Sequence, residues 1–288
     1  MSRVLVLGGG GMAGHMISLV LGDRGHEVLS IQRTEALNCD RVDVEKNEDL
    51  RNYIISKKPD VVVNCVGVLI KESEDNPERS IRINSLLPRM LSRLGRENHF
   101  RLIHLSSDCV FSGRNGPYSE EDFRDADDVY GRTKALGEII NDRDLTIRTS
   151  IVGPDIKKEG SGLFSWFMRQ RGTIKGYACA MWGGVTTLEL AKAIDILIAE
   201  GTTGLVHLTN GKAISKYDLL KLFQILWERD DVVIEFDESY ISYRGLRSSR
   251  MDFQYIVPSY RAMLEDMKAF MVEHEELYCL YEKNTINN

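Results

Sequence analysis

A run of glycines near the N-terminus constrains the fold more than any other feature of this chain. It joins an apolar, β-branched segment at 3–7, which predicts a buried strand, to a segment at 12–25 with the apolar spacing of a helix. Gly8, Gly11 and Gly14 recur at every third position. A side chain there would block the sharp turn, the approach of a phosphate to the backbone amides and the packing of helix on strand. The segment therefore predicts a dinucleotide site.

Met12 and Ala13 lie among these glycines and belong to the same predicted site. A glycine-rich turn without a ligand is the alternative, because the motif alone is weak. Its position directly after the first strand and at the start of a helix favours the dinucleotide.

The rest of the first half alternates short apolar runs with helical patterns. Further strands are expected at 26–31, 60–67, 101–107 and 145–151, and helices at 47–58, 77–98 (interrupted or bent at Pro88) and 130–140. This order predicts an α/β fold, a Rossmann-type doubly wound parallel sheet with ligands beyond the carboxyl ends of its strands. A smaller C-terminal substrate-binding lobe is expected. The predicted boundaries are 1–155 for the dinucleotide-binding domain, with a returning segment near 187–210, and 156–186 with 211–288 for the lobe.

Composition excludes several classes of protein. The 288 residues carry a net charge of −6 without a basic run, which argues against nucleic acid as a partner. No apolar run reaches the length of a membrane span, and no signal peptide precedes the first strand. The five cysteines form no C-x-x-C motif, so neither a disulfide framework nor a metal site is expected. We expect a soluble, cytoplasmic protein that makes no contact with a membrane.

The end of the second strand bears on the choice of dinucleotide. An NAD site usually has an acid there that binds the ribose 2′-hydroxyl, whereas this chain has Arg33. Arginine suits a 2′-phosphate by its charge and its fork of donors, so NADP is favoured. Glu35 would be the acid of an NAD site if the strand runs longer. Alternatively, Arg33 is a surface residue that contacts only water.

Two further segments are expected along the cofactor. Asp43, followed by Val44, comes after a short third-strand pattern and could accept from an adenine amino group, or it is a loop acid. The strand at 60–67 ends in Asn64, Cys65, Val66 and Gly67. The final glycine would let a bound ribose approach the backbone.

Three features predict carbonyl reduction. Ser106 and Ser107 leave the strand at 101–107, and Tyr130 and Lys134 are four residues apart on one face of a helix. A phenol with a pKa of ~10 needs about 4 kcal/mol of stabilisation of its anion to titrate near 7. The Lys134 ammonium can supply much of it, and Lys134 could also bind the nicotinamide ribose. Ser107 would hold the carbonyl oxygen. Taken alone, Tyr130 and Lys134 would be an ordinary surface pair, and Ser106 and Ser107 would be part of a turn at the end of a strand.

The motifs GGGGMAGH, LSSDCVFSGRNGPYSEED, VYGRTKALGE and IRTSIVG resemble those of the extended short-chain dehydrogenases/reductases, and most of all the dTDP-4-dehydrorhamnose reductase group. The resemblance is strong over 1–155 and weaker beyond. It implies Ser107, Tyr130 and Lys134 as the catalytic triad. It also implies NAD(P)H-dependent reduction of the 4-keto group of a nucleotide-linked 6-deoxyhexose, in deoxysugar or surface polysaccharide biosynthesis.

The chain departs from that group in the expected sugar site. Cys109 and Ile151 stand where the group often has an aromatic residue. These departures favour a related dTDP- or UDP-linked 4-keto-6-deoxy sugar, with a 2-acetamido group as an option, at least as much as dTDP-4-dehydrorhamnose. Ser106 and Asp108 are expected beside them.

Four more residues are expected at the substrate on weaker grounds. Asn84 lies in a helix that flanks the cleft in the relatives, and Trp182 stands beside two glycines in a segment expected to form a loop over the sugar. Arg247 and Arg250 could hold the diphosphate by charge-assisted bonds. Alternatively, Asn84 is an ordinary amide inside a helix, Trp182 is a core residue, and the two arginines are surface residues.

Other functions share this fold. A sugar-nucleotide 4,6-dehydratase usually has an Asp-Glu pair after the catalytic hydroxyl, whereas Asp108 is followed here by Cys109. A 4-epimerase with tightly bound NAD retains Ser, Tyr and Lys and stays open. So does a non-catalytic role like that of the regulatory subunit of methionine adenosyltransferase. A homodimer is an option that the sequence leaves open.

Overall fold

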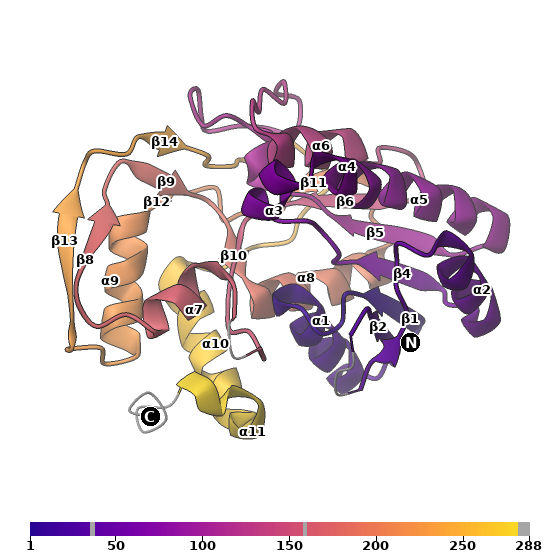
Figure 1. Cartoon of the computed structure of the whole chain (residues 1–288), viewed down its shortest axis with the longest axis horizontal. Coiled ribbons are helices and arrows are strands. Elements are labelled where there is room, and N and C mark those ends of the chain that lie inside the picture. The colour runs from indigo at the N-terminus through magenta and orange to yellow at the C-terminus, as the bar shows by residue number, and fades with distance from the viewer. Residues whose placement is uncertain (35–37, 158–159, 282–288) are drawn as a thin grey trace.

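The computed structural model describes residues 1–34, 38–157 and 160–281, and its largest unit is a parallel sheet of seven strands (Figure 1). The strand order is β11-β6-β5-β4-β1-β2-β3, and every neighbouring pair is parallel. The strands are β1 (Arg3–Leu7), β2 (Glu27–Gln32), β3 (Asp40–Arg41), β4 (Val61–Asn64), β5 (Arg101–Leu105), β6 (Leu145–Arg148) and β11 (Gly204–His207). The predicted Rossmann-type sheet is confirmed, with one strand more than the six of its usual order.

Helices cover both faces of the sheet. Figure 1 shows α5 and α6 on one side and α1 and α8 on the other. The helices connecting the sheet strands are α1 (Met12–Asp23), α2 (Asn47–Lys57), α3 (Ile70–Asp75), α4 (Pro77–Ser80), α5 (Leu87–Asn98), α6 (Val129–Gly137) and α8 (Thr187–Glu200). Strand β1 shows why both faces must be covered: Val4 and Val6 enter one hydrophobic cluster, and Leu5 and Leu7 enter the other.

The long helix predicted at 77–98 is interrupted before Pro88. A π-helical turn, Ile81–Leu86, separates α4 from α5, and Pro88 stands at the start of α5. Proline cannot donate to the carbonyl four residues earlier, which is that of Asn84. Helix α6 approaches this carbonyl at Gly137, where a Cβ atom would lie only 1.9 Å from the Asn84 oxygen.

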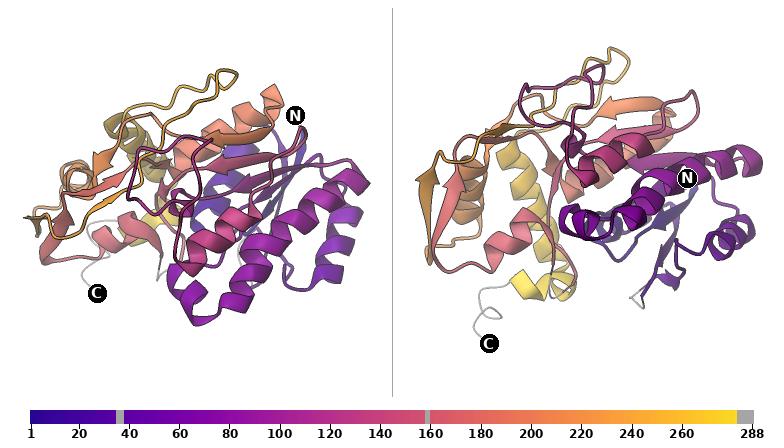
Figure 2. Two further views of the ribbon diagram at one scale, coloured as in Figure 1. Left: turned by 90° about the horizontal axis from the view of Figure 1, so that it is seen from above. Right: turned by 45° about the horizontal axis from the view of Figure 1, so that its top comes forward.

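A second lobe lies beside the sheet in both views of Figure 2. It contains two small strand groups, β8 with β13 and β9 with β12 and β14, and a further pair, β7 with β10, lies near it. Its elements and that pair are β7 (Ile151–Val152), α7 (Gly162–Met168), β8 (Gly172–Tyr177), β9 (Ala180–Trp182), β10 (Val185–Thr186), β12 (Ile214–Ser215), α9 (Lys216–Leu226), β13 (Val232–Asp237), β14 (Ser242–Tyr243), α10 (Tyr260–Glu273) and α11 (Glu275–Tyr278). Strand β11, which lies in the returning segment predicted near 187–210, belongs to the main sheet. The predicted domain boundaries themselves stay a prediction.

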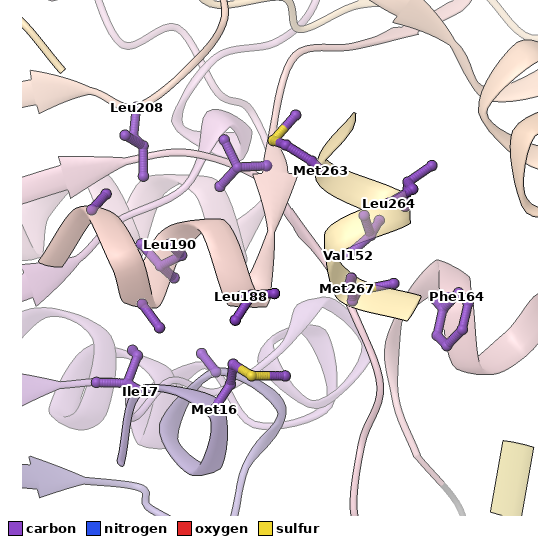
Figure 3. Packing of buried hydrophobic residues seen from close by; sticks show 14 of the residues in the cluster. Met16, Ile17, Val152, Phe164, Leu188, Leu190, Leu208, Met263, Leu264 and Met267 are labelled. Carbon is purple, nitrogen blue, oxygen red and sulfur yellow. The ribbon is translucent and has the colours of Figure 1, made fainter. Parts of the chain in front are cut away.

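The two lobes share one hydrophobic cluster. Figure 3 shows Met16 of α1, Leu188 and Leu190 of α8 and Met267 of α10 in it, with Phe164 of α7 nearby. Apolar packing across this contact fixes the lobe against the sheet. Within the described part of the chain, no helix is long and apolar enough to cross a membrane.

Candidate active site

Two cavities adjoin at the carboxyl ends of β1 and β4, the point where the strand order reverses. One has a volume of ≈ 330 Å³ and is lined by Gly8, Gly11 and residues that follow β2 and β3. The other has ≈ 420 Å³ and is lined by residues that follow β5 and by α6. Both are lined by Cys65, Val66 and Gly67. An extended ligand could therefore run from one into the other past this segment. We call them the nucleoside cavity and the catalytic cavity.

The glycine turn is built for a phosphate. Gly8 has a positive φ of 82°, and a Cβ on Gly14 would lie 2.1 Å from the Gly8 oxygen, so neither position accepts a side chain without strain. Helix α1 begins directly after Gly11 without a side-chain cap. Its first-turn amides are therefore free to bind an anion, and the helix dipole favours negative charge there. These features fit the pyrophosphate of a dinucleotide.

The nucleoside cavity contains the predicted Arg33, Asp43 and Val44. The Arg33 side chain is 60% exposed and 3.7 Å from Glu45 Oε1. Asp43 Oδ1 accepts a hydrogen bond from the backbone amide of Glu45, 3.0 Å away. Asp43 thus shapes the loop after β3 while it lines the cavity. Glu35, the alternative acid, lies outside the described residues.

The catalytic cavity brings together Ser107, Tyr130 and Lys134, and Met12 and Ala13 line it from α1. Asp128 caps α6 by accepting from the amide of Gly131 at 2.7 Å, which fixes the helix that carries the tyrosine and lysine. Lys134 is buried, and its Nζ donates to the Leu105 carbonyl at 2.6 Å. The end of β5 thus holds the ammonium beside the serines.

The protonation states of the side chains in the catalytic cavity suit a proton donor. Burial raises the pKa of Tyr130, the neighbouring Cys109 and Asp108 act in the same direction, and a hydrogen bond with Ser107 opposes them. Tyr130 is therefore a neutral phenol that still carries its proton. Burial lowers the pKa of Lys134 to about 8, against the opposing charge of Glu138. Its ammonium charge is therefore present below about pH 8, and the role predicted for Lys134, to lower the Tyr130 pKa, stays a prediction.

A buried ion pair supports the floor of the catalytic cavity. Arg148, 1% exposed, donates from Nε and Nη2 to the two carboxylate oxygens of Glu138 at 2.6 and 2.7 Å. Ser106 Oγ donates to Glu138 Oε1 at 2.7 Å. Burial works to raise the pKa of Glu138, but the hydrogen bonds and charge of Arg148 outweigh it and lower that pKa. Ser106 thus lines the cavity, and its hydroxyl is fixed by its hydrogen bond to Glu138.

Asp108, Cys109 and Ile151, which the sequence predicts beside the substrate, also line the catalytic cavity. Burial raises the pKa of the Cys109 thiol to about 12, so it is a neutral group here. Arg244 Nη1 donates to Cys109 Sγ at 3.4 Å. Burial also raises the pKa of Asp108, while the charge of Arg244 opposes it. These three residues thus give the cavity wall a carboxyl group, a neutral thiol and an apolar side chain.

Three predicted site residues are buried and have structural contacts. Asn64 accepts from the amide of Val66 at 3.1 Å and is fully buried. Asn84 is also buried, and its side chain accepts from the amide of Val68 at 2.8 Å and donates to Thr133. Trp182 is 6% exposed and belongs to the hydrophobic core. None of the three lines either cavity.

The two predicted diphosphate ligands, Arg247 and Arg250, also line neither cavity. Arg250 forms an ion pair with Asp252 and donates to the carbonyls of Thr203 and Leu205, at the amino end of β11. That end of the sheet is opposite to the ligand-binding edge. Arg247 is exposed, and its backbone amide donates to the Tyr118 carbonyl. Their order in the sequence could not show which edge of the sheet they reach.

Several lining residues were missed from the sequence. The nucleoside cavity also contains Gln32, Glu45 and Arg79, and the catalytic cavity contains Thr149 and Ser150. The last two directly follow β6, so the rule of carboxyl strand ends could have found them. Arg79 carries no such signal because it lies in a helix. No group of residues in the described ranges could hold a metal ion.

Comparison with known proteins places the chain in a family. The sequence model of the RmlD substrate binding domain matches residues 2–230. The chain belongs to this family. It is thus an oxidoreductase of the short-chain dehydrogenase/reductase type, as the motifs predicted.

Individual relatives agree with this assignment. A dTDP-4-keto-6-deoxy-D-glucose reductase of Streptomyces niveus is 28% identical over 235 residues, which cover 78% of each chain. A structure described as a hypothetical dTDP-4-dehydrorhamnose reductase from Sulfolobus tokodaii has a TM-score of 0.76 and 26% identity, over 90% of this chain and 98% of that one. The dTDP-4-dehydrorhamnose reductase of Bacillus anthracis in complex with NADP has a TM-score of 0.82 at 18% identity, over 93% and 99%. The last likeness concerns the fold alone.

Proposed function

We propose that this chain is an NADPH-dependent reductase of the 4-keto group of a nucleotide-linked 4-keto-6-deoxyhexose, in deoxysugar or surface polysaccharide biosynthesis. One observation supports this most: Ser107, Tyr130 and Lys134 line a single cavity that adjoins the glycine turn past Cys65–Gly67. A hydride donor and a proton donor could therefore reach the same carbonyl group.

The residues of the catalytic cavity have distinct roles in this proposal. The reduced nicotinamide would supply the hydride when bound. Tyr130 holds the proton that the carbonyl oxygen must gain, since burial keeps its hydroxyl neutral. Ser107 is in hydrogen-bond contact with Tyr130 and would orient the same oxygen. Lys134 is buried beside them, and its charge would stabilise the phenolate left by proton transfer.

NADP is the favoured cofactor, with NAD as the alternative. Arg33 lines the nucleoside cavity where a 2′-phosphate would lie. The similar Bacillus anthracis structure holds NADP. The glycine turn serves either dinucleotide, because both contain the same pyrophosphate.

The substrate proposal rests on the relatives and on the catalytic cavity. The Streptomyces niveus relative is named for a dTDP-linked 4-keto-6-deoxy sugar. Cys109 and Ile151 line this cavity and are smaller than the aromatic residues that the group often has at these positions, which would leave room for a larger group on the sugar, such as a 2-acetamido group. We therefore include both dTDP- and UDP-linked sugars.

Turnover with a panel of 4-keto sugars tests the proposal. The purified protein is first analysed for bound nucleotide, and then NADPH oxidation is followed with dTDP- and UDP-linked 4-keto-6-deoxy sugars, with and without a 2-acetamido group. NMR of the product is expected to show a 4-hydroxyl in place of the 4-keto group. Tightly bound NAD with interconversion of 4-epimers would instead indicate an epimerase. Binding of nucleotide without turnover of any sugar would rule out the reductase.

A further inference from the structure

We propose that Arg79 joins Arg33 in a two-arginine site for the 2′-phosphate of NADPH, and that the carboxylate of Glu45 competes with this phosphate for the two arginines. The proposal rests on the NADPH-dependent function proposed above and names the residues that set its cofactor preference. Arg33 was predicted from the sequence, whereas Arg79 and Glu45 come only from the structure.

The two arginines converge on one carboxylate oxygen. Arg79 donates from Nε and Nη2 to Glu45 Oε1, both at 2.8 Å. Arg33 Nη1 is 3.7 Å from the same atom. All three side chains line the nucleoside cavity together with Gly8, where the pyrophosphate is expected. An anion thus already lies between two guanidinium groups at the edge of the cofactor site.

Arg79 is held in place from its backbone outward. Asn76 Oδ1 accepts from the Arg79 amide at 3.1 Å, and Pro77 begins the short helix α4. The remaining guanidinium nitrogen, Nη1, is paired with Glu72. The side chain is only 20% exposed. Its fork is therefore oriented toward the cavity before any ligand arrives, which reduces the entropy lost on binding.

A phosphate would compete well with Glu45 for this position. A phosphate monoester carries a charge of about −1.5 to −2 at pH 7 and three acceptor oxygens, whereas the carboxylate has a single charge. Glu45 also presents the same oxygen, Oε1, to both arginines. Arg79 can keep its contact with Glu72 while Nε and Nη2 turn from the carboxylate to the phosphate. Glu45 then weakens NADPH binding by competition, and Arg79 strengthens it.

Contact of Arg79 with the adenine ring is the competing role. An arginine can stack on an aromatic face, and adenine is expected in the same cavity. Stacking would contribute equally to NADH and NADPH, because both contain adenine. The ratio of the two affinities therefore separates phosphate binding from stacking.

Titration of NADPH and NADH, followed by cofactor fluorescence, tests the proposal in four proteins: the unaltered chain, Arg79→Gln, Glu45→Gln and Arg82→Gln. Arg82 is the matched control, since it is exposed, lies three residues further along and lines neither cavity. The preference for NADPH, taken as Kd for NADH divided by Kd for NADPH, is expected to fall about tenfold or more in Arg79→Gln, as for loss of a charge-assisted hydrogen bond. It is expected to rise in Glu45→Gln and to stay unchanged in Arg82→Gln.

These outcomes separate this inference from the proposed function. An equal loss of both cofactors in Arg79→Gln would indicate stacking and overturn the two-arginine site. A fall of the preference in Glu45→Gln would overturn the competing role of Glu45. Both results leave the reductase intact. If the unaltered chain binds neither cofactor, the proposed function fails, and this inference fails with it. Binding of 2′,5′-ADP against 5′-AMP repeats the comparison without nicotinamide.

Discussion

The two cavities differ in how far their lining residues are exposed to water. The catalytic cavity is built from buried groups: Ser106, Ser107, Asp108 and Lys134 are each at most 8% exposed. The nucleoside cavity has a more exposed rim, where the Arg33 side chain is 60% exposed. Electrostatic effects are strong where water is excluded and weak where it screens. Single substitutions in the catalytic cavity should therefore change activity or stability strongly, whereas those in the nucleoside cavity should change cofactor affinity only moderately.

Loss of the Tyr130 hydroxyl should have the largest effect. In Tyr130→Phe, kcat is expected to fall by about 10²–10⁴-fold, the usual contribution of a general acid. NADPH binding should persist, because the phenol ring and the glycine turn remain. Stopped-flow turnover and cofactor titration measure the two separately. Tyr177→Phe, at the end of β8 and outside both cavities, is the control. Full activity in Tyr130→Phe would refute the assignment.

Breaking the ion pair beneath the catalytic cavity should cost about 3–5 kcal/mol of folding free energy. Glu138→Gln leaves the buried Arg148 without a carboxylate, and a buried charge without a partner is strongly destabilising. Urea unfolding measures the change. The matched control is Glu97→Gln, which breaks an exposed pair with Arg51 and should cost less than about 1 kcal/mol. Equal losses in the two variants would contradict the contrast between buried and exposed charges.

The value of kcat/KM should fall as the pH rises above about 8. The Lys134 pKa is lowered to about 8, so its ammonium is present below this pH and is lost as the pH rises through it. If Lys134 stabilises the phenolate, kcat/KM should drop toward tenfold per pH unit beyond that point. The position of this limb should not move in Cys109→Ala, since the Cys109 pKa is about 12. A value of kcat/KM that stays constant up to pH 10 would show that the charge of Lys134 takes no part in the reaction.

Arg250→Ala should have the smallest effect. Its guanidinium binds Asp252 and two carbonyls at the amino end of β11, away from both cavities. The KM for the nucleotide sugar is expected to stay within about twofold, with a stability loss of about 1 kcal/mol for the lost hydrogen bonds. Steady-state kinetics and urea unfolding measure these quantities. A large rise of that KM alone would restore the diphosphate role predicted from the sequence.

Predictions based on local spacing agreed with the structure. The glycine turn, the i, i+4 pair of Tyr130 and Lys134 and the serines after β5 all depend on residues close together in the chain, and parallel strands bring their carboxyl ends to one edge. Predictions about the second lobe did less well. Trp182 proved to be a core residue, because a large apolar side chain next to glycines does not reveal which surface covers it.

The sequence by itself determined the order of strands and helices, the Rossmann-type sheet and the residues at its strand ends, because these depend on short-range periodicity and on glycine. Only the tertiary structure decided which distant charges meet. Glu45 lies between Arg33 and Arg79, and Arg148 is buried against Glu138. Long, charged side chains look alike in a sequence whether they reach a ligand, a buried partner or water. Their partners are fixed by the packing of helices on the sheet, which no local pattern records.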